Sequence, residues 1–548
     1  MNQKLADIMF PDVATTPEYY ENLYPLRQCK QGARITRIAP SPTGYLHLGV
    51  LFTAMVNQMT ARASDGVFYF RLEDTDKKRE VEGGAEDILN GLRAYGVIPD
   101  EGFIAPGVIS GDYGPYRQSE RTEIYQTYAK ALVGAGLAYP CFCSEQELQS
   151  IRQEQERQKL RTGYLGEFAV CRNLEPEQAI KRIKSEHPYV VRLRSGCAPG
   201  NQRIVFNDLI KGKIEMPEND EDFVLLKSDG IPTYHFAHAI DDHLMRTTHV
   251  IRGDEWISSV PKHIQLFSML GFKPPKYAHV SPIMKEEGSG KRKLSKRKDP
   301  EAAVRYYAEQ GFPADSVLEY LMTVACSDYE QWRRCNPKKT RDEFPFGLKK
   351  MSASGALFDL LKLNDVSKTV IAGMDADAVL SAVLEWAKKY APDYFVLLDR
   401  DHGYAREIFS VDRGGAKPRK DIAKWCELPE YTAYFFDETF RIDDAMPDSI
   451  KHEDIRAILT EYAKIYDPQD DRQQWFDKIK SICTPLGFCP DVKQYKSNPD
   501  QYKGHVGDVS TVIRIAVTGR KNTPDLCSIM RVIGRERVLA RFEQAVTI

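Results

Sequence analysis

The chain has 548 residues, of which 42% are hydrophobic and 28% charged, and its formal net charge is -2. A chain of this length is too long to fold around one hydrophobic core, so we expect three or more domains. The small net charge argues against a protein that coats nucleic acid through overall positive potential. A polyanionic partner would therefore have to bind local basic patches.

The N-terminus and the cysteine distribution indicate a cytoplasmic protein. No apolar run approaches the ~18 residues that cross a bilayer, and residues 1–7 lack the apolar stretch of a signal peptide. The 11 cysteines are an odd number and lack the dense spacing of a secreted disulfide scaffold. We expect reduced thiols and no membrane partner.

The first 105 residues predict an extension followed by a βαβ unit. Residues 1–33 read as a short helix ending near Phe10 and an aromatic connector that contains proline. A strand over 34–39, a helix whose apolar positions run from Leu48 to Met59, and a strand over 67–72 follow. This order indicates a parallel sheet, and we assign 34–105 to the first half of a Rossmann-type catalytic domain.

The alternation weakens after Gly96, which predicts an α+β insertion into that domain. The insertion, 106–222, contains a polar helix over 145–160 and antiparallel strands such as 189–194. We assign 223–285 to the second half of the split sheet domain, because a strand (223–227), a helix (233–244) and a further strand (247–252) succeed one another there.

Strand signals fade towards the C-terminal part of the chain. Residues 286–345 predict a basic loop and a connecting domain. Apolar stripes over 379–387 and 455–465 recur at helical spacing, with Pro and Gly breaks between them. We therefore expect an all-α region over 346–548.

The first chemical motif is the turn over 39–50, where a strand passes into a helix. Ligands of parallel sheets bind at the carboxyl ends of strands, and a helix N-terminus favours anions. His47 could meet a phosphate there, and Gly49 would let a flat adenine approach the backbone. Taken alone, such a His-x-Gly sequence is more often a capped helix start with a structural histidine.

The second motif is the run over 291–298, in which six of eight residues are basic, with Gly288 and Gly290 just upstream. Alone it fits a solvated charge run or a nonspecific nucleic-acid patch. A cationic loop can also clamp a triphosphate and stabilise charge that develops at phosphorus. The presence of both motifs in one chain favours a nucleoside triphosphate site.

Together these motifs resemble those of the class I aminoacyl-tRNA synthetases of the bacterial glutamyl type. Residues 37–49 match the family's "HIGH" region, although Val50 replaces the second histidine, and 293–297 match its "KMSKS" loop. Further matching segments follow in the family's order, at 71–76, 114–121, 228–235, 241–245 and 250–256. The resemblance covers about residues 34–300.

The resemblance implies a role for each matching residue. Arg37 and Arg252 would hold the carboxylates of a glutamate substrate, since a guanidinium binds carboxylates in a bidentate manner. Glu73 would face the substrate ammonium group. The glutamate site would be completed by Ser41, Tyr234 and His238, where relatives often have Asn. The ATP site would comprise His47, Gly49, Glu255, Trp256, Lys293, Lys296 and Arg297, of which His47, Lys293 and Lys296 are the expected catalytic residues.

The implied reaction is ATP-dependent attachment of L-glutamate to tRNA(Glu) through a glutamyl-adenylate, with release of AMP and diphosphate. The resemblance implies Mg²⁺ as a cofactor and a monomer whose insertion binds the acceptor end and whose helical region binds the anticodon. Charging of tRNA(Gln) as well, or a glutaminyl-type enzyme, stays open. From other classes, a small-molecule nucleotidyltransferase and a non-catalytic RNA-binding scaffold are the alternatives.

Three minor features also carry predictions. Some glutamyl enzymes bind zinc in the insertion, and Cys141, Cys143 and Cys171 could do so here with Tyr164 as the one candidate fourth ligand; we favour buried or free thiols. Residues 350–354 spell the "KMSKS" letters more closely than 293–297, but we expect only an N-cap and turn, because Ala353 replaces the lysine. In the C-terminal region, candidate phosphate contacts are Arg514, Arg520 and Lys521.

Overall fold

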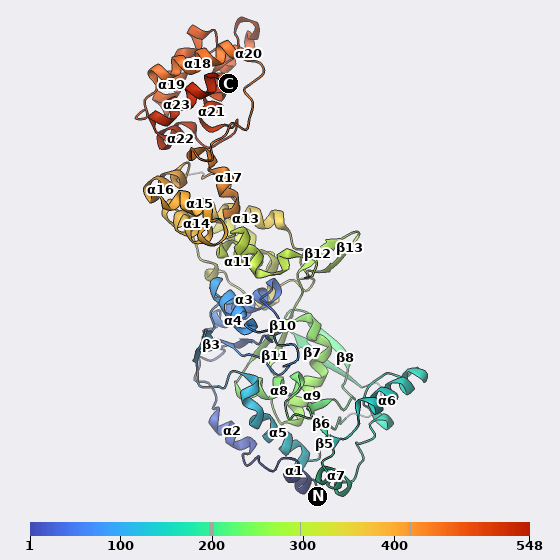
Figure 1. Cartoon of the computed structure of the whole chain (residues 1–548). Helices are drawn as coiled ribbons and strands as arrows, with labels where there is room; N and C mark the ends of the chain where they lie inside the picture. Colours follow the sequence, from blue (N-terminus) through green and yellow to red (C-terminus); the bar gives the residue numbers. More distant parts are fainter. Residues whose placement is uncertain (197–201, 296, 416–417, 548) are drawn as a thin grey trace. The chain divides into compact units, whose positions relative to one another are not determined.

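The computed structural model describes residues 1–196, 202–295, 297–415 and 418–547 (Figure 1). It divides into two compact units. Unit 1 comprises Met1–Tyr306 and Leu318–Asp359, and unit 2 comprises Tyr307–Val317 and Leu360–Ile548. Unit 1 is mixed α/β and unit 2 is helical, which confirms the predicted fold class. No described helix is long and apolar enough to cross a bilayer.

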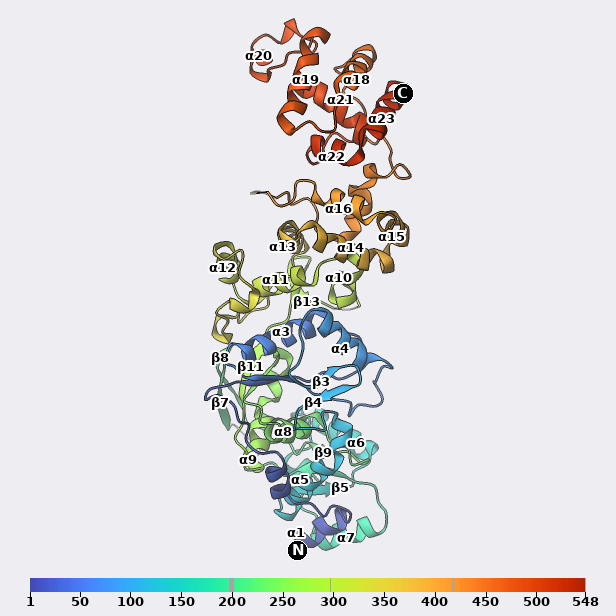
Figure 2. The same cartoon turned by 90° about the vertical axis from the view of Figure 1, so that its left-hand side faces the viewer.

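The predicted βαβ unit is present in unit 1. Strand β1 (Ile35–Ile38) pairs in parallel with β2 (Val67–Phe70), and α3 (Leu48–Arg62) connects them. Strand β3 (Glu101–Ala105) continues the parallel sheet, and β4 (Val108–Ser110) closes it antiparallel. Helix α3 is buried along most of its length because it packs on β1 and β2. Figures 1 and 2 show it above β3, a strand of the same sheet.

The second half of the split domain returns beside the first. Strands β10 (His249–Gly253) and β11 (Lys276–Val280) pair in parallel, and β10 packs next to β1. The backbone N–H of Thr248 donates to the carbonyl of Ile35 at 3.1 Å. The beginnings of β1 and β10 therefore lie side by side, although about 210 residues of sequence separate them.

The insertion forms its own antiparallel sheet. Its strands are β5 (Ala138–Cys141), β6 (Val190–Leu193) and β9 (Val224–Leu226), and a separate hairpin is formed by β7 (Arg203–Asp208) and β8 (Gly212–Pro217). The expectation that 223–227 belongs to the parallel sheet is wrong, because β9 pairs antiparallel with β6. A short apolar strand carries no signal for which sheet it joins.

The N-terminal extension is more ordered than its sequence predicts. Besides the expected α1 (Asn2–Met9), the connector contains α2 (Pro17–Leu23), which begins with proline at its first position. Tyr20 and Tyr24 are buried and join the same apolar cluster as α5 and α8. The Arg27 guanidinium lies 2.6 Å from the Glu101 carboxylate. The extension is therefore packed onto unit 1.

The remaining elements of unit 1 include the polar helix predicted in the insertion, which is α6 and projects near β5 in Figure 1. Helices α10 and α11 contribute residues to both units. The elements of unit 1 not yet given are α4 (Gly84–Ala94), α5 (Thr122–Gly134), α6 (Glu145–Arg157), α7 (Pro176–Lys184), α8 (Tyr234–Leu244), α9 (Val260–Met269), α10 (Val304–Gln310), α11 (Ala314–Ala325) and α12 (Tyr329–Cys335), with the hairpin strands β12 (Met284–Glu287) and β13 (Gly290–Lys293).

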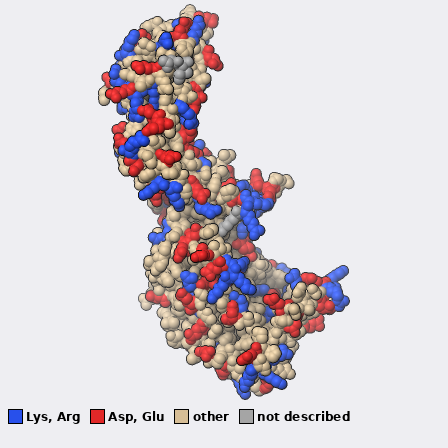
Figure 3. Space-filling view, in the orientation of Figure 1, with Lys and Arg blue, Asp and Glu red and all other residues tan. Residues whose placement is uncertain are grey.

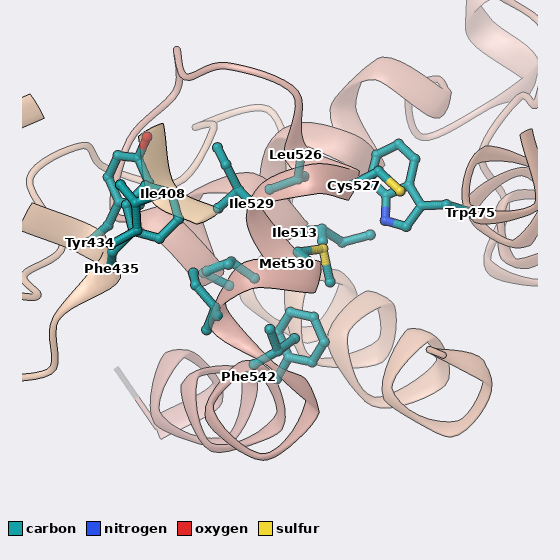
Figure 4. Close-up of a cluster of buried hydrophobic side chains, with 14 of the residues drawn as sticks. Ile408, Tyr434, Phe435, Trp475, Ile513, Leu526, Cys527, Ile529, Met530 and Phe542 are labelled. Atoms are coloured by element: carbon teal, nitrogen blue, oxygen red, sulfur yellow. The ribbon is translucent and has the colours of Figure 1, made fainter. Parts of the chain in front are cut away.

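Unit 2 is built from helices around one apolar core. The two predicted stripes lie on α14 and α18 and are buried in that core, part of which Figure 4 shows around Ile513, Met530 and Phe542. The helices are α13 (Leu360–Gly373), α14 (Ala376–Tyr390), α15 (Pro392–Asp399), α16 (His402–Ser410), α17 (Leu428–Tyr431), α18 (His452–Ile465), α19 (Arg472–Leu486), α20 (Val492–Ser497), α21 (Val506–Thr518), α22 (Leu526–Ile533) and α23 (Arg535–Thr547).

The segment 350–354 is a turn, but not an N-cap. Helix α13 begins only at Leu360. The Ala353 carbonyl accepts hydrogen bonds from Lys211 Nζ at 2.7 Å and from the Ser281 hydroxyl at 3.0 Å. This segment therefore closes over the end of β11 within unit 1.

Candidate functional site

The turn between β1 and α3 presents His47 as the N-cap of the helix. Its Nδ1 atom accepts a hydrogen bond from the Val50 N–H at 3.3 Å, which satisfies one of the free donors of the first turn. A Cβ atom on Gly49 would lie 3.2 Å from the His47 ring. His47 also forms an isolated antiparallel bridge with Ala303, so the first motif lies beside the chain that follows the basic loop.

The basic loop leaves the β12–β13 hairpin and is held by Asp299. The Asp299 carboxylate accepts from Arg292 Nη2 at 2.8 Å and from the Ser295 N–H at 2.9 Å, and Lys285 Nζ lies 3.1 Å away. The bond from Arg292 lowers the pKa of Asp299 far below its ordinary value, although burial acts to raise it. The base of the loop is therefore a closed ion-pair network.

The predicted cations of this loop face outward. Lys293 is exposed, and its Nζ lies 3.5 Å from a carboxylate oxygen of the exposed Glu255. Arg297 is exposed as well. Lys296, the expected main catalytic lysine, lies outside the described residues. Figure 3 shows Lys and Arg side chains around the hairpin, mixed with Asp and Glu.

A buried cluster of three arginines and three carboxylates lies at the ends of β1 and β2. Arg37 Nε is 3.3 Å from both carboxylate oxygens of Asp242, and Arg71 Nη1 is 2.7 Å from the same group. Arg71 Nη2 also bonds Glu73 at 3.0 Å. The third pair joins Arg121 Nε to Asp241 at 2.7 Å. Charges in this cluster balance one to one.

The cluster sets the protonation of its carboxylates. Burial alone would raise the pKa of the Asp242 carboxyl, but Arg37 and Arg71 hold that pKa well below its ordinary value. For Glu73, burial dominates and raises the pKa, although Arg71 and Arg37 act against it. Asp242 is thus a fixed anion.

Arg252, on β10, is buried but is held differently. Its Nε donates to His279 Nε2 at 3.2 Å, and its Nη1 donates to the Tyr234 hydroxyl at 3.1 Å. Its Nη2 donates to His263 Nδ1 at 3.2 Å and to the Trp256 carbonyl at 3.4 Å. Among the described residues, no carboxylate forms an ion pair with Arg252.

Tyr234 joins the two arginine environments. Burial raises the pKa of its hydroxyl, and the charges of Arg252, Glu73 and Arg37 act on that pKa in turn. Its ring lies 4.3 Å from the Trp256 ring by centroid distance and 5.8 Å from the stacked His238 ring. The structure therefore brings together five of the six residues predicted for glutamate.

Two of the six residues predicted to bind glutamate, His238 and Ser41, have contacts that differ from those of the other four. His238 Nδ1 lies 2.7 Å from Asp242, and its Nε2 lies 3.2 Å from the Tyr277 hydroxyl, so both ring nitrogens have partners inside the protein. Ser41 is exposed in the β1–α3 turn, and within the described chain no hydrogen bond links it to the other five.

Sequence reasoning gave no role to several residues that build this site. Arg71 and Asp242 stand inside matching segments, which is a signal that could have found them. His263 and His279 belong to no quoted motif. Their contacts with Arg252 arise from α9 and β11, and nothing in the local sequence points to them.

The insertion contains a compact group of three thiols and a phenol. The Cys143 and Cys171 sulfurs are 3.7 Å apart, and the three cysteine sulfurs all lie within 4.8 Å of one another. The Tyr164 hydroxyl lies 3.4 Å from Cys141 Sγ and 3.3 Å from Cys143 Sγ. Tetrahedral Zn–S bonds of ~2.3 Å imply S–S distances of about 3.8 Å, so the three sulfurs are spaced as zinc ligands would be, with the Tyr164 phenol beside them.

The side chains of this group shift one another's pKa values in opposite directions. Hydrogen bonds from Cys143 and Cys171 lower the pKa of the Cys141 thiol, whereas Cys141 raises that of Cys143. Burial, with the bonds to Cys141 and Cys143, raises the pKa of the Tyr164 hydroxyl. The guanidinium of Arg192 lies 4.0 Å from the centre of the Tyr164 ring.

The candidate phosphate contacts of the C-terminal region are engaged inside unit 2. Arg514 Nη1 donates to the Pro524 carbonyl at 3.0 Å, and Arg520 pairs with Glu430. The backbone N–H of Lys521 donates to Asp444 at 2.6 Å. Arg514 therefore has a structural function in a loop, whatever else it contacts.

Comparisons with known proteins extend over the whole chain. The family model "tRNA synthetases class I (E and Q), catalytic domain" matches residues 34–365, and an "Anticodon binding domain" model matches 497–546. A glutamate–tRNA ligase of Clostridium beijerinckii is 50% identical over 553 residues, covering 100% of both chains. One of Acetivibrio thermocellus is 48% identical and covers 99% of both.

A solved structure gives the same result at lower identity. The crystal structure of a glutamate tRNA ligase from Elizabethkingia meningosepticum, in complex with its amino acid, superposes with a TM-score of 0.74 at 28% identity. The match covers 94% of this chain and 99% of that one.

Proposed function

The chain belongs to the glutamate–tRNA ligases of the class I aminoacyl-tRNA synthetases, and from this premise we propose that it joins L-glutamate to tRNA(Glu) at the expense of ATP. The observation that carries the substrate assignment is Arg252. A buried guanidinium that pairs with no carboxylate of the described residues, next to Arg37 and Tyr234, suits a substrate that brings its own carboxylate.

The first half-reaction activates the amino acid. The α-carboxylate oxygen of glutamate attacks the α-phosphorus of ATP, the bond to the β-phosphate oxygen breaks, and diphosphate leaves. Glu73 would face the ammonium group of the substrate, and Arg252 and Arg37 its carboxylates. His47 and the lysines 293 and 296 would offset negative charge that develops on the phosphates.

The second half-reaction transfers the glutamyl group. A hydroxyl of the terminal ribose of tRNA attacks the acyl carbon, and AMP leaves. Gly49, Glu255 and Trp256 would contact the nucleotide, and Arg297 its phosphates. Mg²⁺, bound through the ATP phosphates, would supply further charge compensation.

We assign the larger parts of the chain to the two ends of the tRNA. The insertion, 106–222, would hold the acceptor end, and the helical region, 346–548, the anticodon. The enzyme would act as a monomer. This division is supported by the anticodon-binding match over 497–546, which a small nucleotidyltransferase would not need.

We further propose that Cys141, Cys143, Cys171 and Tyr164 hold a structural zinc ion. The sequence alone favoured free thiols, but the distances between the four ligand atoms support the metal. Its chemistry would be to crosslink β5 to the 164–171 loop, without a part in the reaction.

The test of function is aminoacylation with labelled glutamate and glutamine on transcripts of tRNA(Glu) and tRNA(Gln). We expect glutamate on tRNA(Glu) and no glutamine on either tRNA, because glutamine lacks the side-chain carboxylate and would leave one of the two guanidinium groups without its counter-ion. Efficient charging with glutamine would contradict the assignment. Glutamate found on tRNA(Gln) would show a second tRNA substrate and leave the amino acid assignment intact.

A further inference from the structure

Within the part of the chain that the structure describes, Arg252 is held by neutral hydrogen-bond acceptors only. Its four partners are the His279 and His263 rings, the Tyr234 hydroxyl and the Trp256 carbonyl. A guanidinium has five donors and no acceptor. Each contact therefore requires the partner atom to accept, which fixes Nε2 of His279 and Nδ1 of His263 in their unprotonated form.

The tautomer of His279 is fixed from its other side as well. Since Nε2 accepts from Arg252, Nδ1 carries the proton, and it lies 2.6 Å from Asp208 Oδ2. Asp208 is itself anchored, because its Oδ1 accepts from the N–H groups of Ile210 at 2.9 Å and Lys211 at 2.8 Å. Burial raises the pKa of Asp208, but its bond from His279 and those from the backbone lower it overall, so Asp208 is an anion.

The chain of hydrogen bonds continues through His263. With Nδ1 occupied by Arg252, its Nε2–H donates to His235 Nδ1 at 3.0 Å. Burial lowers the pKa of His263 well below its ordinary value and that of His279 below it, and burial lowers that of His235 to about 4. These rings are therefore neutral at neutral pH, which their role as acceptors requires.

This arrangement contrasts with that of Arg37. Arg37, Arg71 and Arg121 each contact a carboxylate of the protein directly, and Arg37 shares that of Asp242 with Arg71. Arg252 keeps its full charge, and the nearest acid in its hydrogen-bond chain, Asp208, is one imidazole away. A carboxylate in place of His279 would neutralise Arg252 and compete with a substrate carboxylate.

We propose that His279 and His263 are positioning residues that fix Arg252 through neutral acceptors, and that Asp208 selects the required tautomer of His279. The arrangement orients the guanidinium while leaving its charge for the substrate carboxylate. This inference rests on the proposed glutamate-binding role of Arg252.

The experiment measures aminoacylation of tRNA(Glu) by full-length His279→Phe, which keeps a flat ring but removes the acceptor and the donor. We expect the KM for glutamate to rise about 10-fold or more, since a hydrogen bond to a charged group is lost. The KM for ATP should stay within about twofold and kcat within about threefold, because Arg252 binds the amino acid and not the nucleotide.

A conservative variant separates positioning from packing. In His279→Gln, the amide oxygen can accept from Arg252 and the amide N–H can donate to Asp208, so the KM for glutamate should return to within about threefold of the wild-type value. The matched control is His249→Phe. His249 lies on the neighbouring strand β10 and, like His279, is buried. Burial lowers its pKa to about 4, but it contacts Thr248 and not Arg252.

Should His279→Phe fail to fold, Asp208→Asn tests the same chain of contacts, with a rise in the glutamate KM of about threefold to 10-fold. An unchanged glutamate KM in a folded His279→Phe or Asp208→Asn variant would overturn the inference. So would equal increases for glutamate and ATP, or the absence of rescue by His279→Gln. Failure of the wild type to charge tRNA(Glu) with glutamate would instead overturn the proposed function.

Discussion

At the scale of single residues, Asp242 is the centre of the buried charge cluster. Its carboxylate contacts Arg37, Arg71 and His238, and it also accepts from the Tyr69 hydroxyl at 3.3 Å. All of these groups are buried. Removing the one anion would leave two guanidinium groups in an apolar interior with half of their compensation.

We expect Asp242→Asn to lower the free energy of unfolding by about 3–5 kcal/mol, because breaking a buried ion pair leaves an uncompensated charge. Urea denaturation followed by circular dichroism measures this change. Asp112→Asn, at an exposed position of the same unit, should change stability by less than about 0.5 kcal/mol. A comparable, small effect at Asp242 would contradict the assigned role.

The buried histidines make stability depend on pH. Burial lowers the pKa of His235 and His238 to about 4 in the folded state, against an ordinary value of 6.5. Between these two values the unfolded chain binds protons that the folded chain does not. Stability contributed by the neutral rings is therefore fully present above pH 6.5 and is lost as the pH falls towards 4.

We expect each such histidine to lower the unfolding free energy by about 1.4 kcal/mol per pH unit within that range. Urea midpoints measured between pH 7 and pH 5 test this. Replacement of His235 by Gln, which does not titrate, should reduce the slope of unfolding free energy against pH by the contribution of one proton. A pH dependence identical to that of the wild type would show that His235 titrates normally in the folded protein.

At the scale of elements, Asp299 controls the basic loop. It ties Arg292 and Lys285 of the hairpin to the backbone of Ser295, at the base of the segment that contains the expected catalytic lysine. Without these bonds, the loop would have to be ordered when ATP binds, and this ordering opposes binding.

We therefore expect Asp299→Asn to raise the KM for ATP about fivefold to 10-fold, with less effect on the KM for glutamate. Pyrophosphate exchange, run with tRNA present, measures both constants. Glu286→Gln, at an exposed position on β12, is the control and should match the wild type. Equal effects of the two substitutions would indicate that Asp299 contributes only to the general charge of the hairpin.

The zinc proposal also belongs to this scale. A structural ion that links β5 to the loop around Cys171 should stabilise the insertion, so Cys171→Ser should lower the melting temperature and the zinc content together. Elemental analysis of purified protein measures the second quantity, and Cys335→Ser, at an exposed cysteine, is the control. Wild-type protein free of zinc after purification without chelators would refute the site.

The elements differ in how far the sequence predicts them. The βαβ unit around His47 and the helices α14 and α18 could be predicted from the spacing of apolar residues, since a long apolar pattern fits only one type of secondary structure. Strand β9 was assigned to the wrong sheet because three apolar residues fit either. The contacts of Arg252 could not be predicted, because Asp208, His263 and His279 come from three elements whose pairing is set only by the tertiary fold.

At the scale of the whole molecule, each of the two units has its own core. Trp256 and Trp332 belong to unit 1, whereas Trp386, Trp425 and Trp475 belong to unit 2. Units with separate cores can unfold in separate transitions. Ligands that bind only one of them stabilise that transition by mass action.

We expect calorimetry to show two unfolding transitions, and ATP with glutamate to raise the temperature of only one. When all three tryptophans of unit 2 are replaced with Phe, the remaining change in tryptophan fluorescence on heating should report only the unfolding of unit 1, which is the transition that the ligands shift. A single transition that shifts as a whole would mean that the units unfold together. Unfolding scans with and without the substrates make this comparison.

The one-to-one balance of the arginine cluster has a consequence for ionic strength. Arg37, Arg71 and Arg121 form a buried set with their carboxylates, and Arg252 is buried as well. Dissolved ions screen charges that water reaches, with a Debye length of about 8 Å at physiological salt, and screen buried ones much less. Recognition of the amino acid should thus persist in concentrated salt, whereas affinity for tRNA, which depends on displaced counterions, should fall steeply. Raising the salt concentration should therefore weaken the binding of tRNA while the binding of glutamate stays nearly constant.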